Sequence, residues 1–217
     1  MKYEALIFDL DGTLLDTLDD LADSVNAVLS ANGYPTKTRD EVCQAVGSGM
    51  KNLIVRVLPD GLNDPSFDRI LNEFKAYYGA HCEDKTAPYV GITEMLEKLR
   101  LAGVKMAIVS NKADYAVKTL SKRWFADVIP VAIGENEAAG IRKKPAPDTV
   151  DLALRELGVT RAQAAYVGDS DVDVQTALNC EMPCLSVTWG FRDREFLLAH
   201  GATELLDTPQ ALWDAVQ

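Results

Sequence analysis

The sequence has few histidines and no Cys-x-x-Cys pair. Only His81 and His200 occur among the 217 residues. The four cysteines are Cys43, Cys82, Cys180 and Cys184. Without a Cys-x-x-Cys pair, neither a tetrahedral zinc site nor a disulfide framework is expected, and we predict reduced, mostly buried thiols. Neither histidine lies near a nucleophile signature, which argues against a serine or cysteine catalytic triad.

Basic residues are scarce relative to acidic ones. The chain has 22 Lys and Arg against 33 Asp and Glu, a net charge of −11 at pH 7. Nucleic-acid binding requires clustered basic residues, so we expect no nucleic-acid partner. No apolar run approaches the roughly 20 residues of a membrane-spanning helix. Because the N-terminus runs directly into a strand-like segment with no room for a signal peptide, we expect a cytoplasmic protein without a membrane partner.

Short apolar runs alternate with amphipathic helical patterns along most of the chain. Runs over residues 5–8, 104–109 and 164–167 end abruptly at polar residues, and a fourth covers 184–187. Such runs are typical of strands covered on both faces. The apolar spacing over 92–102 predicts a helix between two of them. We therefore predict an α/β fold built on a doubly wound parallel sheet with right-handed crossovers.

The alternation is interrupted once. A helical stripe over 18–29, which Asn32-Gly33 is expected to end, is followed by helical patterns over 39–46, 50–58 and 67–82 with no strand between them. Strand-like runs resume only after residues 85–88. We predict a core domain of residues 1–15 and 85–217, and a helical domain of residues 16–84 inserted through two thin connections.

Polar residues gather where the predicted strands end, which is where open parallel sheets bind their ligands. These residues are Asp9, Asp11, Gly12, Thr13, Ser110, Asn111, Gly168, Asp169, Ser170 and Asp173. Four carboxylates placed together would repel one another, and a cation is the natural relief. An all-oxygen ligand set favours Mg²⁺ over zinc. Lys144, on a proline-flanked loop, would add a positive charge.

Each of these residues also has a purely structural interpretation. Asp9 and Asp11 could only form a turn, Asp169 or Ser170 could cap the next helix, and Lys144 could be solvated. Either interpretation is open for any one residue taken alone. Their joint placement at strand ends favours a site.

Four segments resemble, in order, the motifs of the haloacid dehalogenase-like hydrolase superfamily. Residues 9–16 (DLDGTLLD) are similar to its DxDGT signature, and 110–112 (SNK), 144–145 (KP) and 168–173 (GDSDVD) to its second, third and fourth motifs. The insertion resembles the family's four-helix cap, and the resemblance covers essentially the whole chain. Residues 166–169, 173–177 and 188–190 make the chain most similar to the phosphoglycolate phosphatases. The implied fold is a Rossmann-like core with an inserted α-helical cap domain.

The resemblance implies a Mg²⁺-dependent phosphatase that hydrolyses the phosphate monoester of a small metabolite, with 2-phosphoglycolate as the first candidate. Asp9 would attack phosphorus and form an aspartyl phosphate, and Asp11 would act as acid and then base. Asp9, Asp169 and the backbone carbonyl of Asp11 would hold Mg²⁺. Asp173 would orient Lys144 or a metal-bound water.

The phosphoryl group would be bound by four residues. Ser110 would donate a hydrogen bond, Asn111 would contribute from its side chain or backbone, and Lys144 would offset charge on the nucleophile and the phosphoryl group. Thr13, the fourth, would brace the loop. The small phosphorylated metabolite is the only partner implied, and we expect a monomer or homodimer.

The helical insertion is expected to open and close over the reaction. Within it, Lys51 or Arg56 could contact a substrate carboxylate, although solvated basic residues at a helix start are the favoured interpretation.

The main alternative function is a β-phosphoglucomutase-like phosphotransferase, or a nucleotidase or pyrophosphatase of the same superfamily. A non-catalytic phospho-receiver domain would not need Asp11, and a haloacid dehalogenase, which does not require Mg²⁺, would not need the acidic Asp169 and Asp173.

Overall fold

The computed structural model describes residues 1–217, and the chain divides into two compact units. We call Met1–Leu15 with Pro88–Gln217 the core, and Asp16–Ala87 the insertion. Where the chain passes between the units, β2 (Leu15–Asp16) and β3 (Ala87–Pro88) pair as a two-stranded sheet. None of the helices is both long and apolar enough to span a membrane.

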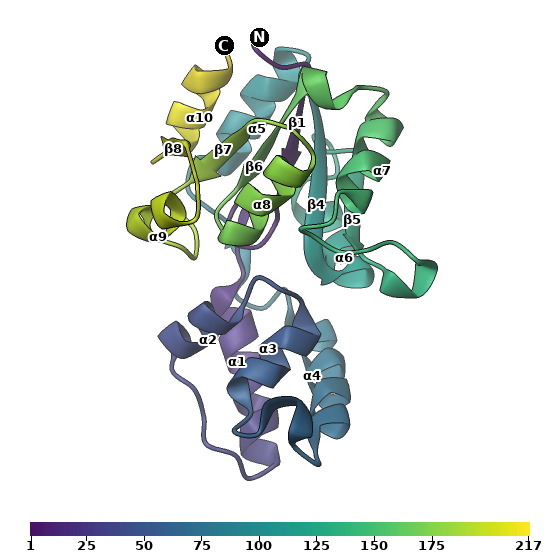
Figure 1. Cartoon of the computed structure of the whole chain (residues 1–217), viewed down its shortest axis with the longest axis vertical. Coiled ribbons are helices and arrows are strands. Elements are labelled where there is room, and N and C mark those ends of the chain that lie inside the picture. The colour runs from purple at the N-terminus through teal and green to yellow at the C-terminus, as the bar shows by residue number, and fades with distance from the viewer. The chain divides into compact units, whose positions relative to one another are not determined.

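The core is built on a six-stranded sheet whose paired strands all run parallel. Its strands are β1 (Ala5–Phe8), β4 (Lys105–Ala113), β5 (Val131–Glu135), β6 (Ala164–Gly168), β7 (Cys184–Val187) and β8 (Glu204–Leu206) (Figure 1). Their order is β5-β4-β1-β6-β7-β8, so the chain builds outward from one side of β1 and then crosses to the other. Such a reversal of strand order is the place where these sheets bind ligands.

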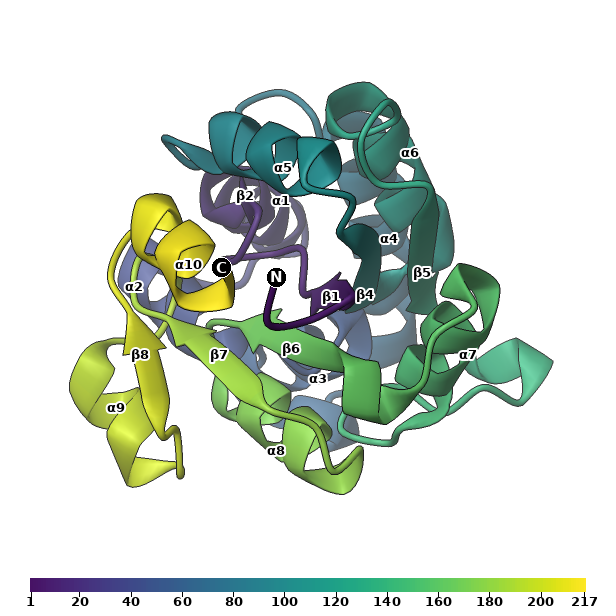
Figure 2. The same ribbon diagram turned by 90° about the horizontal axis from the view of Figure 1, so that it is seen from above.

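Helices cover both faces of this sheet. The core helices are α5 (Ile92–Leu101), α6 (Asp114–Trp124), α7 (Asp148–Leu157), α8 (Asp171–Asn179), α9 (Arg194–Ala199) and α10 (Pro209–Val216). Leu6 and Phe8 of β1 belong to a hydrophobic cluster that includes residues of α5, α6 and α10. Ala5 and Ile7 belong to a second cluster, on the other face of the sheet, that includes residues of α7 and α8 (Figure 2). The alternation follows from the two-residue period of a strand. The predicted α/β class with a doubly wound parallel sheet is confirmed.

Strand β4 is longer than the sequence indicates. Its apolar run stops at Val109, but β4 continues to Ala113. Pairing with β5 becomes irregular there, because Val109 lies opposite Ile133 whereas Ala113 lies opposite Glu135. From one pair to the next, β4 therefore uses four residues where β5 uses two, which is a bulge. At a bulge the side chains, here those of Ser110, Asn111 and Lys112, no longer alternate regularly between the two faces of the sheet.

Four α-helices form most of the insertion. Its helices are α1 (Leu18–Ala31), α2 (Arg39–Ala45), α3 (Met50–Val57) and α4 (Phe67–His81), and α1 packs against α2 and α4. Helix α1 ends at Asn32 and Gly33, where Gly33 adopts a φ of 74° that favours glycine. A capping box between Thr38 and Glu41 starts α2. Both ends lie where local sequence signals place them.

Candidate active site

Two aspartates lie at the ends of adjacent strands, β1 and β6, where the strand order reverses. Asp9 directly follows β1, and Asp169 directly follows the neighbouring strand β6. Parallel pairing places both at the carboxyl edge of the sheet. The third aspartate, Asp173, lies in the first turn of α8. Two parallel strands and the helix after one of them therefore deliver three carboxyl groups to one place.

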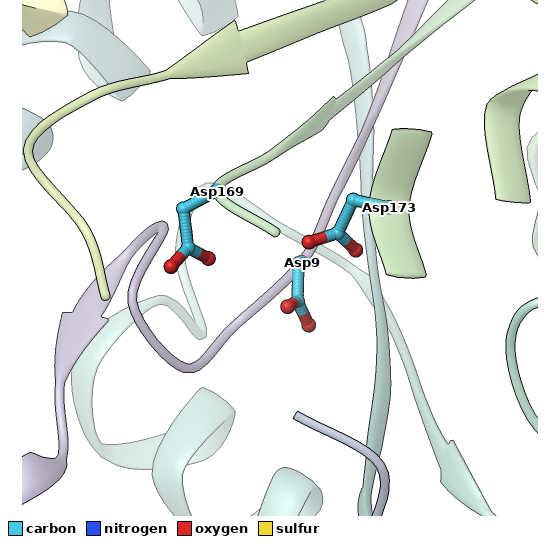
Figure 3. Close-up of side chains that lie close together, drawn as sticks. All are labelled: Asp9, Asp169 and Asp173. Carbon is cyan, nitrogen blue, oxygen red and sulfur yellow. The ribbon is translucent and has the colours of Figure 1, made fainter. Parts of the chain in front are cut away.

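These three carboxyl groups form a compact buried cluster. Asp9, Asp169 and Asp173 each offer an oxygen within 4.8 Å of the others. Figure 3 shows the carboxyl groups gathered together, each carried by a different stretch of backbone. Burial of like charges at such separations is unfavourable unless a cation or proton compensates them.

Lys144 is the positive charge inside the cluster. Its ammonium lies 2.9 Å from Asp9 Oδ1 and 2.8 Å from Asp173 Oδ1. It also donates to the Tyr166 hydroxyl at 3.0 Å, and that hydroxyl donates to Asp173 Oδ1 at 3.1 Å. Burial alone would lower the pKa of Lys144, but Asp173 and Asp9 outweigh it and hold the pKa above its usual value. The lysine is therefore charged at neutral pH.

One ammonium does not balance three carboxylates. Burial raises the pKa of Asp9 to about 7, with Asp173 adding to the rise and Lys144 opposing it. Burial likewise raises the pKa of Asp169 well above its usual range, helped by the charges of Asp173 and Asp9. With all three ionised, three negative charges and one positive charge leave a net charge of −2. The cluster is short of positive charge by the amount that one divalent cation carries.

Asp169 is held in place by hydrogen bonds to both of its oxygens. Thr13 Oγ1 donates to Oδ1 at 2.9 Å, and the backbone N–H of Phe191 donates to Oδ2 at 2.7 Å. Thr13 is fully buried and is in turn fixed by Trp189, whose indole N–H donates to the Thr13 carbonyl at 3.0 Å. The loop after β7 therefore orients a carboxylate that belongs to the end of β6.

Two glycines allow this close packing. A Cβ at Gly12, whose φ is 85°, would lie 2.3 Å from Asp169 Oδ2. A Cβ at Gly190 would lie 2.3 Å from the Gly12 carbonyl oxygen and 2.4 Å from Asp169 Cβ. All three distances are shorter than any van der Waals contact, so the turn after β1 and the loop after β7 approach Asp169 only because these residues lack side chains.

Asp173 has a structural and an electrostatic role at once. Its Oδ2 accepts from the backbone N–H and the hydroxyl of Ser170, completing the capping box of α8. Its Oδ1 accepts from Lys144. The capping interpretation therefore holds for Ser170, while Asp169 has a different role.

The polar residues at the end of β4 are buried and directed to different partners. The Asn111 side-chain amide donates to the Lys144 carbonyl at 3.0 Å and so fixes the loop that carries the lysine. The Ser110 hydroxyl accepts from the backbone N–H of Lys112 at 3.3 Å. The Lys112 ammonium lies 2.7 Å from Asp11 Oδ1. Asp11 is thereby placed beside a cation different from the one that contacts Asp9.

Most of the predicted site residues fall into two hydrogen-bonded groups. Asp9 and Asp173 pair with the Lys144 ammonium and Asn111 donates to the Lys144 carbonyl, while Thr13 donates to Asp169. No role for Lys112, Tyr166 or Phe191 follows from the sequence motifs. Lys112 and Tyr166 lie inside the motif segments, but nothing in those segments reveals a contact 101 residues away.

Arg56 of the insertion donates hydrogen bonds to groups at and just beyond the C-terminal end of α2. Its guanidinium donates to the Ala45 carbonyl at 2.7 Å and to the Ser48 hydroxyl at 3.2 Å. These contacts satisfy groups at the end of α2, which favours the structural interpretation of this arginine. Lys51 is exposed near the start of α3.

Comparison with known proteins places the chain among hydrolases. The profile of the haloacid dehalogenase-like hydrolases matches residues 6–187. An N-acetylmuramic acid 6-phosphate phosphatase of Pseudomonas aeruginosa is 28% identical over 100% of this chain and 96% of its own length. A phosphoglycolate phosphatase of Rhodobacter capsulatus is 35% identical over 87% of this chain and 85% of its own. A crystal structure from Lactobacillus delbrueckii subsp. bulgaricus, assigned as a phosphoglycolate phosphatase, superposes with a TM-score of 0.95 at 38% identity, covering 100% of this chain and 99% of that one.

Proposed function

We propose a function from one premise: this chain belongs to the haloacid dehalogenase-like hydrolase family and is a phosphatase of that type. It hydrolyses the phosphate monoester of a small carboxylic acid in a Mg²⁺-dependent reaction. The observation that carries the proposal is the buried cluster of Asp9, Asp169 and Asp173 around the Lys144 ammonium. Such a cluster has the charge and the oxygen donors to bind a divalent cation together with a phosphoryl group.

The cluster fits Mg²⁺. Its ligands would be oxygens only, which suits a hard cation, and its net charge of −2 would be neutralised by one divalent ion. Asp9, Asp169 and the backbone carbonyl of Asp11 would hold the ion. When bound, it would offset the negative charge of the transferring phosphoryl group.

Asp9 would be the nucleophile. Its Oδ1 accepts from the Leu10 N–H at 2.7 Å and from Lys144, which leaves Oδ2 for attack. In the first step an Oδ2–phosphorus bond forms, the phosphorus–ester bond breaks, and the departing oxygen takes a proton from Asp11. In the second step a water oxygen attacks phosphorus, Asp11 takes the water proton, and phosphate leaves with Asp9 restored.

The remaining residues would stabilise the phosphoryl group. Lys144 would balance charge on Asp9 and on the phosphoryl oxygens, and Asp173 would keep that ammonium in position. Ser110 would donate its hydroxyl hydrogen to a phosphoryl oxygen. The Asn111 side chain is engaged by the Lys144 carbonyl, so its contribution would come through the loop that it fixes.

Two phosphorylated acids are the candidate substrates. The named compounds of the Rhodobacter and Pseudomonas relatives, phosphoglycolate and N-acetylmuramic acid 6-phosphate, are both phosphate esters of carboxylic acids. We take 2-phosphoglycolate as the first candidate and the larger sugar acid as the second. A cytoplasmic location, a monomeric or homodimeric state, and opening and closing of the insertion stay predictions.

The test is phosphate release from a panel of esters, with Mg²⁺ and with EDTA. The panel would contain 2-phosphoglycolate, N-acetylmuramic acid 6-phosphate, a hexose phosphate, a nucleoside monophosphate and pyrophosphate. Mg²⁺-dependent release dominated by the phosphorylated acids supports the proposal. If folded protein releases phosphate from no ester of the panel, the proposal is contradicted. Isomerisation of the hexose phosphate without phosphate release would favour the phosphotransferase.

Asp9→Asn is the mechanistic control. It should abolish turnover while the protein remains folded, since the amide is a far weaker nucleophile. Asp171→Asn changes an acidic residue of the same segment that lies outside the cluster, and should retain activity. Appreciable turnover by Asp9→Asn would refute the nucleophile assignment.

A further inference from the structure

We propose that Lys112 is a positioning residue that fixes one oxygen of the Asp11 carboxyl group, so that the other oxygen handles the proton of the leaving group; the inference rests on the proposed function. Nothing in the composition of the SNK segment distinguishes this lysine from a solvated one. The contact between Lys112 and Asp11, and the burial of that contact, carry the inference.

Lys112 lies in the part of β4 whose pairing with β5 is irregular. In a regular strand the side chains of Ser110, Asn111 and Lys112 would alternate between the two faces of the sheet. The shift in pairing between Val109 and Ala113 interrupts that alternation at these three residues. Bulges that redirect side chains in this way are frequent beside active sites.

The ion pair is asymmetric in its exposure. The Lys112 side chain is 3% exposed and its Nζ lies 2.7 Å from Asp11 Oδ1, whereas the Asp11 side chain is 20% exposed. A lysine that only filled space would gain nothing from its charge, because burying an ammonium costs more than burying an apolar side chain of similar size. Lys105, on the same strand, places its ammonium on the Leu157 carbonyl and contacts no carboxylate.

The contact differentiates the two oxygens of Asp11. Oδ1 accepts from Lys112, and Oδ2 accepts no hydrogen bond from the protein. With one oxygen held, rotation of the carboxyl group is restricted and Oδ2 keeps a fixed direction. Proton transfer depends steeply on such alignment, so the anchor acts on the rate and not on substrate binding.

The leaving group provides a selective test. An alkyl phosphate needs its departing oxygen protonated, whereas the nitrophenolate of p-nitrophenyl phosphate leaves without a proton. The experiment measures kcat and KM of the full chain with Mg²⁺ for both compounds, using 2-phosphoglycolate or the best alkyl phosphate of the panel. The variants are Lys112→Met, Lys112→Arg, Asp11→Asn and the double variant Lys112→Met with Asp11→Asn.

Lys112→Met should lower kcat/KM for the alkyl phosphate by about 10- to 100-fold and for p-nitrophenyl phosphate by less than about 3-fold. KM for the aryl ester should stay unchanged. Lys112→Arg should recover part of the loss, and the double variant should be no worse than Asp11→Asn alone. Lys118→Met, which removes a 64% exposed lysine paired with Asp114, is the matched control and should change neither value.

Each other outcome has a definite meaning. An equal loss of kcat/KM for both esters, or no loss of kcat/KM for the alkyl ester, would overturn the positioning role while the proposed function stands. Wild-type protein inactive on every ester would overturn the proposed function and this inference with it. If Lys112→Met fails to fold, Lys112→Arg decides, because it keeps the charge but moves it, and the same leaving-group selectivity is required of it.

Discussion

Asp9→Asn should stabilise the metal-free protein at neutral pH while it removes activity. Burial, with the charge of Asp173, raises the pKa of Asp9 from 3.8 to about 7. Because the folded protein holds this proton more tightly than the unfolded chain, the unfolded chain loses it first as pH rises. The free energy of unfolding therefore falls between about pH 4 and pH 7. An amide at this position removes that loss.

The size of the effect follows from the shift. One pKa unit corresponds to about 1.4 kcal/mol, so ionised Asp9 costs the metal-free protein at most about 4 kcal/mol above pH 7. The Asn carbonyl oxygen can still accept from the Leu10 N–H and from Lys144. Its NH₂ group, however, must be buried, at a cost of about 1–3 kcal/mol. We expect a net gain of about 2 kcal/mol, a rise in Tm of about 4–8 °C for a chain of this size.

Thermal unfolding in EDTA at pH 5 and pH 7.5 measures this gain. The variant should exceed wild type at pH 7.5 but not at pH 5, where Asp9 of the wild type is already protonated. Mg²⁺ should reverse the order, because a ligand at 100 times its Kd stabilises by about 2.7 kcal/mol the protein that binds it. Asp171→Asn should leave the difference between the two pH values unchanged. A variant less stable than wild type at pH 7.5 in EDTA, or one shifted equally at both pH values, would refute the reasoning.

Three further substitutions probe the supports of the site and of the insertion. Gly190→Ala would put a Cβ 2.4 Å from Asp169 Cβ, so we expect a loss of about 1–3 kcal/mol in urea unfolding together with a large fall in kcat. Thr13→Val removes the hydroxyl that holds Asp169 and should raise the Mg²⁺ concentration for half-maximal activity by about 10-fold, and an unchanged Mg²⁺ titration would contradict this. Asp20→Ala deprives the buried N–H and hydroxyl of Thr86 of their acceptor and should destabilise the insertion by about 3 kcal/mol in urea, with wild-type stability as the refuting result.

The fold class could be predicted from the sequence because the relevant signals are local. A buried parallel strand needs an apolar run, and Ala5–Phe8 and Cys184–Val187 are such runs with the bounds that the structure has. Helix ends carry their own signals, as Asn32 and Gly33 do at the end of α1. Strands β5 and β8 were not singled out by the sequence interpretation. Both lie at the edges of the sheet, and β8 is only three residues long.

The extent of β4 could not be predicted, because it depends on partners far along the chain. Ser110, Asn111 and Lys112 are polar, and polarity indicates the end of a buried strand. They can be buried within β4 because Asn111 finds the Lys144 carbonyl and Lys112 finds Asp11. Neither partner is near in sequence, so the local pattern cannot reveal that the Asn111 amide N–H and the Lys112 ammonium have buried acceptors.

The sequence alone therefore singled out the candidate site residues Asp9, Asp169, Asp173 and Lys144, whereas their electrostatic state was set only by the tertiary structure. The aspartates stand out because each lies where a predicted strand ends or the next helix begins, and Lys144 stands out because it lies on a proline-flanked loop. That Lys144 lies between Asp9 and Asp173, that Asp173 also caps α8, and that the pKa of Asp9 is raised to about 7 are consequences of folding. Burial and like-charge proximity shift a pKa only once residues distant in the chain share one enclosed space, and only the folded core creates that space.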